Sequence, residues 1–288
     1  MTVFRVLVGS SLILTVLSGP GAFAQTVPPA GPVEPGVRAA GMGGAFTAMA
    51  DDSSGVYWNP AGLATGGFFS LVVDYSGGDD ASASLIALST PPLGLSYYRT
   101  ATGNLSNGRN SLVAHHAGVT VVQSVVDRLA IGATVKGIHG VVESDSGPSV
   151  SSTKFDVDFG VMASGSLGRL GLTVHNLFEP GFAGPSTPVT LDRRVRAGIS
   201  LNTSRLTTVA ADFDLTGEFR EAAVGAEAHP IGKAWVRAGI HWRTHGGEGD
   251  PEGSVGGTFA VYGSTVVDGQ VSFGRGDTRW GLGLRFVF

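Results

Sequence analysis

The C-terminal stretch Thr278–Phe288 alternates between apolar side chains and polar or small ones. The apolar positions are Trp280, Leu282, Leu284, Phe286 and Phe288. The positions between them are Arg279, Gly281, Gly283 and Arg285, with Val287 as the exception. A period of two indicates a β-strand whose two faces meet different surroundings. In a soluble sandwich the aromatic face would meet a core and the Arg face water, whereas in a membrane barrel the aromatic face would meet lipid and the Arg face a polar lumen. This strand alone is compatible with both.

Composition excludes several classes of protein. The 288 residues suffice for one large β domain or two small ones, and the net charge of −4 gives no reason to expect a nucleic acid as partner. The chain has no Cys, which excludes disulfides and thiolate metal sites. After the first segment, no apolar run reaches the ~18 residues that a membrane helix needs. We predict no cofactor and no metal site.

Residues 1–24 have the layout of a secretory signal peptide. Arg5 supplies a positive charge, Val6–Leu17 is mostly apolar, and Ala22-Phe23-Ala24 is a small-x-small cleavage site. The apolar part is too short for a membrane anchor, and Gly19-Pro20 interrupts it. We therefore predict an exported protein whose mature chain begins at Gln25.

The next segment, residues 25–66, carries a specific signature. After a Pro- and Gly-rich start, Arg38–Ala64 reads RAAGMGGAFTAMADDSSGVYWNPAGLA. This stretch resembles the N-terminal signature of the FadL and PorV/PorQ outer-membrane barrel superfamily, and Asn59-Pro60-Ala61-Gly62 after an aromatic pair is its most specific part. The resemblance implies a hatch, formed by residues 25–66, inside a barrel of fourteen strands. The residues that match the hatch motif are Gly41, Gly43, Gly44, Asp51, Asp52, Trp58, Asn59, Pro60, Ala61 and Gly62.

Two details of this segment follow from the residues themselves. Asn59 is able to bond the barrel backbone while Pro60 fixes the local turn. Asp51-Asp52 offers carboxylates for a calcium ion, but a solvated turn is the commoner outcome and is the interpretation that we favour.

Residues 67–288 contain strand-like runs that recur at regular intervals. The predicted strands are 67–75, 81–90, 93–100, 111–123, 128–140, 153–165, 169–177, 191–202, 205–215, 221–229, 233–243, 253–262, 265–274 and 278–288. Short connections such as Pro91-Pro92 alternate with longer ones such as 101–110, 141–152 and 178–190. About fourteen strands with short turns on one rim and longer loops on the other are typical of a bacterial outer-membrane barrel. We predict an all-β, antiparallel up-and-down transmembrane barrel with the hatch segment inside.

The charges of these strands keep to one face. A charge on the lipid face near the bilayer middle costs about 2–4 kcal/mol, so ionised residues are expected to face the lumen. Arg193 breaks the alternation and should lie near the headgroups. The predicted lumen-lining residues are Asp156, Asp158, Arg194, Arg196, Asp212, Asp214, Arg237, His241, Arg279 and Arg285.

Two functions follow from the resemblance. Similarity to FadL implies transport of hydrophobic, fatty-acid-like small molecules across the bacterial outer membrane, with Phe178 and Phe182 as a candidate apolar landing site. The loops are short, however, and lack long apolar insertions. Similarity to PorV and PorQ implies the alternative, a non-transporting barrel that anchors or shuttles secreted proteins or scaffolds an envelope complex.

An enzyme is a third class, and the sequence does not favour it. The histidines His115, His116, His139, His175, His241 and His245 are scattered, and no spacing marks a partner for nucleophilic catalysis. We predict no catalytic residue. The partners expected are outer-membrane lipid, the barrel-assembly machinery through the C-terminal strand that ends at Phe288, and a hydrophobic small molecule.

Overall fold

The computed structural model describes residues 33–79, 81–105, 110–144, 147–184, 188–216, 220–245, 251–274 and 277–288. The predicted signal peptide (residues 1–24) and the predicted mature start at Gln25 lie outside the described residues. In chain order, the helical elements are α1 (Val37–Gly41), α2 (Gly55–Trp58) and the 3-10 helix η1 (Pro60–Thr65). The strands are β1 (Ser70–Gly77), β2 (Ala81–Thr90), β3 (Leu93–Leu105), β4 (Asn110–Val126), β5 (Leu129–Ser144), β6 (Gly147–Ser164), β7 (Gly168–His175), β8 (Gly181–Phe182), β9 (Val189–Thr190), β10 (Arg194–Asn202), β11 (Thr207–Asp214), β12 (Arg220–Ile231), β13 (Ala234–His245), β14 (Glu252–Tyr262), β15 (Thr265–Gly274) and β16 (Asp277–Val287).

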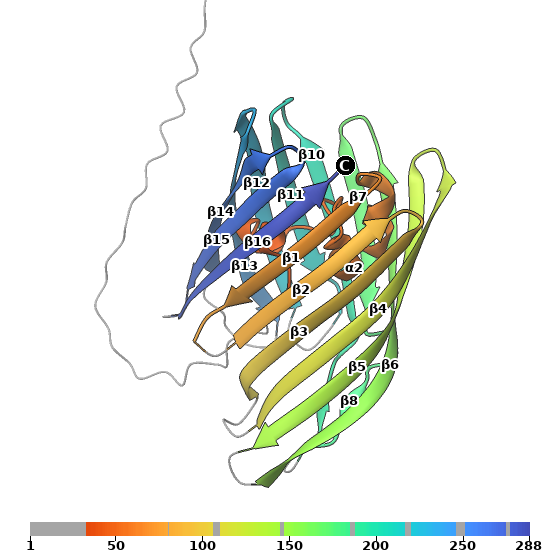
Figure 1. Cartoon of the computed structure of the whole chain (residues 1–288), viewed down its shortest axis with the longest axis vertical. Helices are drawn as coiled ribbons and strands as arrows, with labels where there is room; N and C mark the ends of the chain where they lie inside the picture. Colours follow the sequence, from red (N-terminus) through yellow and green to blue (C-terminus); the bar gives the residue numbers. More distant parts are fainter. Residues whose placement is uncertain are drawn as a thin grey trace, which may run out of the picture.

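The strands form a closed barrel (Figure 1). Within the described residues, 14 strands pair antiparallel in sequence order, and β8 and β9 form a separate two-stranded sheet. The barrel closes between β1 and β16, where Ser70 pairs with Val287 and Gly77 with Trp280. Closure leaves no unpaired edge, which a sheet in lipid requires. The predicted closed, antiparallel barrel of about fourteen strands is therefore confirmed.

Strands β3 to β6 are longer than predicted. β4, β5 and β6 contain 17, 16 and 18 residues, and they extend past the other strands at the end of the barrel opposite the C-terminus (Figure 1). The prediction that 101–110 and 141–152 are loops is wrong over most of their length, because β3 continues to Leu105 and β5 to Ser144. Both stretches are rich in polar and small residues on both faces, so hydrophobic alternation does not mark them as strand.

The outer surface of the barrel is apolar, as the alternation of β16 requires. Trp280 and Leu282 are exposed on the outside, whereas Arg285 points inward to Asp268 on β15. Arg193, the residue that breaks the alternation, lies just before β10 at the rim and pairs with Glu179 at 3.0 Å, as expected near the headgroups. An apolar exterior around a charged interior excludes the soluble sandwich.

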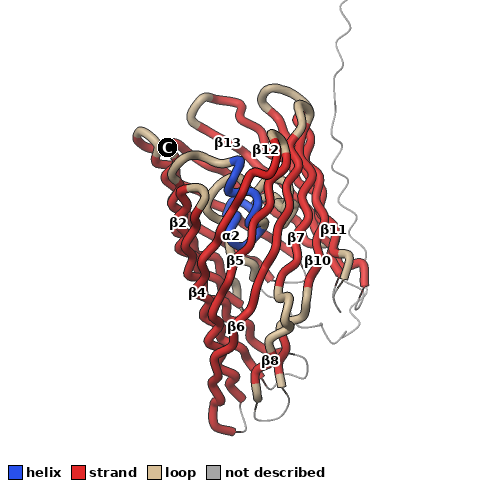
Figure 2. Tube along the Cα trace, turned by 90° about the vertical axis from the view of Figure 1, so that its right-hand side faces the viewer, coloured by secondary structure: helices blue, strands red, loops and turns tan. Residues whose placement is uncertain are grey.

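Residues 33–69, the inner segment, lie inside the barrel (Figure 2). Helix α1 contacts β13 to β16 and β1, while η1 contacts β4, β5 and β6 on the opposite wall. The inner segment therefore crosses the lumen from wall to wall, at the end that carries the short turns and the C-terminus (Figure 1). Among the described residues no helix is long and apolar enough to cross a membrane.

Candidate functional site

The candidate site is the contact between the inner segment and the barrel wall, and Asn59 is at its centre. The Asn59 side chain is fully buried, and its Nδ2 donates to the carbonyls of Thr47 at 2.9 Å and of Val161 on β6 at 3.2 Å. Its Oδ1 accepts from the amide of Ala61, which caps η1, and Pro60 begins that helix. The predicted bond from Asn59 to the barrel backbone is therefore present, and one side chain connects two parts of the inner segment, at Thr47 and at Ala61, to β6.

Inward-facing glycines let the inner segment approach the wall. A Cβ on Gly160 would lie 2.2 Å from Asn59 Oδ1, and one on Gly239 would lie 2.1 Å from the carbonyl carbon of Met42. The same holds on other strands at Gly132, Gly171, Gly198 and Gly225. Backbone can approach backbone this closely only where no Cβ intervenes. This explains much of the high glycine content, 45 residues of 288.

Two glycines of β5 provide a matched test of this packing. A Cβ on Gly132 would lie 2.5 Å from the backbone of Pro60, whereas one on Gly137 would meet its nearest neighbour, the Phe155 ring, at 3.8 Å. We expect Gly132→Ala to destabilise the folded barrel by about 1–3 kcal/mol through overpacking. Gly137→Ala should change stability by about 0.5 kcal/mol or less. Urea unfolding in lipid vesicles measures both, and equal midpoints would contradict the close packing described.

A closed ring of alternating charges pins the inner segment to four strands. The ring runs Arg38–Glu227–Arg237–Asp268–Arg285–Asp52 and back to Arg38, with N–O distances from 2.5 to 3.3 Å. Arg38 and Asp52 belong to the inner segment, and the other members belong to β12, β13, β15 and β16. All six side chains are largely removed from solvent. Each charge has partners on both sides, which is what makes burial of so many ionised groups tolerable.

A second charged cluster holds the start of the inner segment. Glu34 bonds Arg194 and lies 3.5 Å from Arg196, both on β10. Asp214 on the neighbouring strand accepts from both guanidinium groups, at 2.5 and 2.7 Å. Glu221 on β12 completes the cluster at 2.9 Å from Arg194. The acids of three separate segments thus converge on one pair of arginines.

The Glu34 side chain is ionised at neutral pH. Burial on its own would raise the pKa of Glu34, but Arg196 and Arg194 outweigh burial and lower that pKa from 4.5 to about 2. A depressed carboxyl pKa adds stability that is complete above the unfolded value and is lost as the pH falls through the folded value. The contact between Glu34 and β10 therefore persists at any pH above about 4.5.

Two carboxylates of the wall hold backbone amides of the inner segment. Asp212 accepts from the amides of Phe46 and Thr47 at 3.0 and 2.8 Å. Asp74 on β1 accepts from the amide of Val37 at 2.9 Å. Non-helical backbone at membrane depth has no water to bond, so these wall acids satisfy groups that would otherwise be orphaned.

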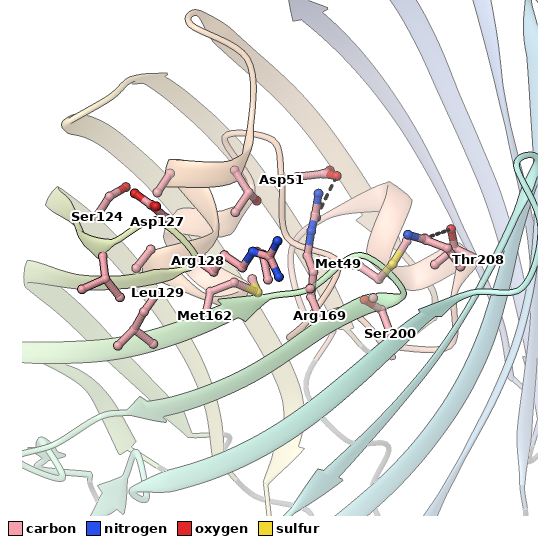
Figure 3. Close-up of a pocket in the computed structure, with 18 of the residues that line it drawn as sticks. Met49, Asp51, Ser124, Asp127, Arg128, Leu129, Met162, Arg169, Ser200 and Thr208 are labelled. Atoms are coloured by element: carbon pink, nitrogen blue, oxygen red, sulfur yellow. Dashed lines mark hydrogen bonds and ion pairs between the residues drawn. The ribbon is translucent and has the colours of Figure 1, made fainter.

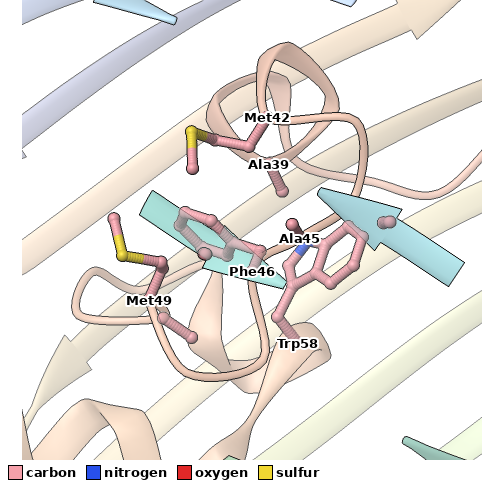
Figure 4. Close-up of a cluster of buried hydrophobic side chains, with 9 residues drawn as sticks. Ala39, Met42, Ala45, Phe46, Met49 and Trp58 are labelled. Carbon is pink, nitrogen blue, oxygen red and sulfur yellow. The ribbon is translucent and has the colours of Figure 1, made fainter. Parts of the chain in front are cut away.

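A small apolar core stabilises the inner segment itself (Figure 4). The rings of Phe46 and Trp58 meet edge to face with centroids 5.9 Å apart, and Met42 and Met49 lie beside Phe46. Trp58 Nε1 donates to the carbonyl of Pro35 at 2.8 Å. Arg196 stacks over the Trp58 ring at 5.4 Å, which joins this core to the second charged cluster.

The other predicted hatch-motif residues lie within this segment and have distinct contacts. Gly41 lies against Gly256 of β14, and Gly43 has a positive φ of 67° with its Cα against β13. A Cβ on Gly62 would lie 1.8 Å from the carbonyl oxygen of Ala50, so this position admits only glycine without movement. Gly44 has a positive φ of 82°, and Ala61 is fully buried.

The interpretation of Asp51-Asp52 as a solvated turn is wrong. Asp52 is buried and pairs with Arg38 and Arg285, while Asp51 pairs with Arg38 at 2.5 Å and with Arg169 on β7 at 3.1 Å. Arg169 and Arg285 belong to strands far along the chain, which local sequence does not reveal, whereas Arg38 lies in the inner segment itself. Among the described residues no group of three or more His, Asp or Glu side chains is arranged to hold a metal ion.

The predicted landing site is also wrong in part. Phe178 is 63% exposed, but Phe182 on β8 is only 1% exposed and packs on the inner face of the extended strands. Its ring lies against Gly140, and its cluster also contains Leu112, Ile138 and Val142. Leu112 and Ile138 lie within the predicted strands, and the unpredicted extension of β5 adds Val142 to this apolar surface.

The structure brings the predicted lumen residues into four groups and leaves one residue apart from them. Arg194, Arg196 and Asp214 form the second cluster, and Arg237 and Arg285 belong to the ring. Asp156 and Asp158 share Lys136 at 3.4 and 2.7 Å. His241 and Arg279 face a common Glu252, at 3.4 and 3.7 Å, and Asp212 stands apart as the amide acceptor.

Several members of the site were missed in the sequence: Arg38, Glu34, Lys136, Glu227, Asp268 and the inward glycines. Lys136, Glu227, Asp268 and the inward glycines had a usable signal, because each lies an even number of residues from an inward-facing neighbour on the same strand. Lys136 lies two residues from Ile138, and Asp268 two from Gln270, both of which face inward. Extending the alternation along every strand would have identified them.

A cavity of about 460 Å³ lies at the short-turn end, between the inner segment and the wall (Figure 3). The turns after β4, β6 and β10 form its outer side, and Met49, Asp51 and Ala64 form its inner side. Arg128 and Arg169 extend into this space beside Met162 (Figure 3). The cavity thus combines two guanidinium groups with apolar surface.

Comparisons with known proteins assign the fold. No family model matches the sequence, and no curated protein matches it. Solved structures do match: the CymD monoaromatic hydrocarbon channel has a TM-score of 0.68 and 16% identity, covering 87% of this chain and 96% of that one. The Ralstonia pickettii toluene transporter TbuX has a TM-score of 0.66 and 15% identity, covering 87% and 97%. A Pseudomonas aeruginosa FadL homologue has a TM-score of 0.65 and 10% identity, covering 90% and 99%. The chain therefore has the fold of the FadL-like outer-membrane barrels.

Proposed function

We propose that this protein is an outer-membrane channel for hydrophobic small molecules, fatty-acid-like solutes among them, and that the inner segment is its hatch. The observation that carries the proposal is the ring of charges through Arg38, which holds the inner segment across the lumen by noncovalent contacts. The similarly folded CymD and TbuX proteins are a monoaromatic hydrocarbon channel and a toluene transporter. The apolar exterior and closed sheet support the outer membrane as location.

The contacts of the inner segment fit a movable closure. Ionic and hydrogen-bonded contacts can exchange for water when a segment moves, whereas an apolar core would expose surface that water penalises. The charged and amide contacts described above are of the polar kind, and the apolar core of Phe46 and Trp58 lies largely within the inner segment. A second apolar cluster joins Val56 and Leu63 of the inner segment to Leu85 and Tyr98 of the wall. Movement of the inner segment therefore leaves the core of Phe46 and Trp58 intact but has to separate Val56 and Leu63 from the wall.

A disulfide lock tests the hatch. The Cα of Gly256 on β14 lies 3.3 Å from a Cβ built on Gly41, so the two positions are in direct contact, and the chain has no native cysteine. We expect the double variant Gly41→Cys/Gly256→Cys to block uptake of labelled toluene and decanoate when oxidised and to restore it when reduced. The strain lacking the gene gives the baseline, and the single variants control for the substitutions.

If the oxidised double variant takes up the solutes as fast as the reduced form, the proposal that the inner segment is a hatch is overturned. If strains with and without the protein take up both solutes equally, the channel proposal is overturned and the secretion-partner alternative is favoured. Capture of secreted proteins with the solubilised barrel would then test that alternative. We also propose that β16, which ends before Phe288, is the strand recognised by the barrel-assembly machinery.

A further inference from the structure

The outward face of strands β3 to β6 changes from apolar to polar along one row of side chains. Arg99 of β3 pairs with His115 of β4, and His115 pairs with His139 of β5. His139 pairs in turn with Thr153 of β6. We call Arg99, His115 and His139 the basic row. On the same face and toward the short turns, the outward residues are exposed and apolar: Leu95, Tyr97, Val119, Val135, Phe155 and Phe159.

The basic row lies where these strands leave the lipid. On β4, the outward residues between His115 and Gln123 are Ala117, Val119 and Val121. This separation of 8 residues corresponds to roughly 27 Å along a strand, and a tilt of about 40° reduces it to roughly 21 Å, close to the height of the apolar band in an outer-membrane barrel. His115 is at the end of that band opposite the short turns. Lipid headgroups are therefore the surroundings of the basic row.

The three basic side chains have no acid between them. In the part of the chain that the structure describes, no carboxylate lies within ion-pair distance of Arg99, His115 or His139. The contact of Arg99 there is a long hydrogen bond of 3.5 Å to Ser82 Oγ. Like charges that lie directly opposite each other on neighbouring strands are destabilising, so an anion between them stabilises this face. That anion has to come from outside the barrel.

Each histidine is held by a hydroxyl group in a way that leaves one ring nitrogen for a ligand. Tyr97 Oη and His115 Nδ1 are 2.7 Å apart, and Thr153 Oγ1 and His139 Nδ1 are 2.9 Å apart. A neutral imidazole has one donor nitrogen and one acceptor nitrogen, so a hydroxyl that donates to Nδ1 leaves Nε2 as an N–H donor. Two Nε2 donors beside a guanidinium match a group with several acceptor oxygens, and a phosphate is such a group.

We propose that the basic row binds the phosphate of a membrane lipid, whose acyl chains lie along the exposed apolar residues of β3 to β5. Directly opposite residues on neighbouring strands are about 5 Å apart, so the three positions span about 10 Å and a single headgroup can contact all of them. The apolar band continues from the basic row without interruption, which distinguishes a lipid phosphate from a free one. The inference goes beyond the channel function and does not depend on it, because it concerns the outer surface of the barrel.

Native mass spectrometry of the purified protein in maltoside micelles tests this with three probes. Dioleoyl phosphatidic acid carries the phosphate on two acyl chains, dioleoylglycerol has the same chains without phosphate, and inorganic phosphate has no chains. We expect saturable binding of phosphatidic acid and at least about tenfold weaker binding of dioleoylglycerol, since a charge-assisted contact accounts for such a ratio. Inorganic phosphate at the same concentration should not displace the bound lipid.

Three variants locate the binding. Arg99→Gln should weaken binding of phosphatidic acid about tenfold, because it removes the guanidinium that contacts the phosphate. Arg205→Gln removes the same charge from the turn between β10 and β11, at the short-turn end of the barrel, and should leave binding unchanged. Arg99→Lys keeps the charge and should retain most of the affinity, whereas a folding defect caused by the loss of Arg99 would lower the affinity of both variants at this position.

Equal affinity for phosphatidic acid and dioleoylglycerol would overturn the inference, as would equal effects of Arg99→Gln and Arg205→Gln. Displacement of the lipid by inorganic phosphate would also overturn it, because the row would then bind a free anion. Toluene uptake controlled by the disulfide lock would still stand in each case, so the channel proposal fails or survives independently.

Discussion

Arg38→Met is expected to destabilise the folded barrel by about 3–5 kcal/mol, the cost typical of removing one partner from a buried ion pair. The change removes the positive charge that lies between Asp52 and Glu227, the two ring members next to Arg38, so both carboxylates lose one cationic partner. Because the inner segment loses its connection to β12, we also expect larger ion conductance in planar bilayers. Unfolding in vesicles measures the first effect and single-channel recording the second.

Arg193→Met is the matched control for this change. Arg193 is 45% exposed on its side chain and pairs with Glu179 at the rim, where an ion pair contributes about 0–1 kcal/mol. The Arg193→Met substitution removes the same charge and adds the same side chain, but it leaves the contacts of the inner segment unchanged. If both variants unfold at the same midpoint and conduct alike, the ring does not hold the inner segment.

Ile240→Arg is expected to destabilise the barrel by about 2–4 kcal/mol, because it puts a charge on the lipid face near the bilayer middle. Ile240 is 42% exposed and lies at the middle of β13. Ile231→Arg makes the same exchange at the rim end of β12, where Ile231 is 68% exposed and the expected cost is about 0–1 kcal/mol. Unfolding in vesicles compares the two, and an equal cost would mean that β13 does not face lipid.

The sequence predicts the barrel well because lipid imposes a rule on every strand. A residue on the lipid face must be apolar, so Trp280, Leu282 and Leu284 reveal their side by alternation alone. This rule does not apply to the parts of strands that extend beyond the lipid. The extended parts of β5 and β6 are mostly polar, with Val141, Val142 and Val150 as apolar exceptions, and for that reason they were mistaken for loops.

The contacts of the site are predicted less completely, because they depend on which strands face each other across the lumen. Alternation places Arg194 and Arg285 on the inner side but does not pair them with Glu34 or Asp52 of the inner segment. Besides Arg38, the partners of Asp51-Asp52 come from β7 and β16, so local sequence suggests a solvated turn. The inward glycines carry the same parity signal as the charges, and their close contacts with Asn59 and Met42 explain their use.

The account depends on the outer surface of the barrel meeting lipid while the inner surface does not, and the absence of native cysteine allows a direct measurement. Spin labels on Leu282→Cys, an exposed position on β16, and Ser272→Cys, an inward position on β15, are compared in vesicles for collision with oxygen and with a water-soluble nickel chelate. The account predicts that the label at 282 collides mainly with oxygen, which concentrates in lipid, and that the label at 272 does not share this preference. Collision of the label at 282 mainly with the nickel chelate would contradict it.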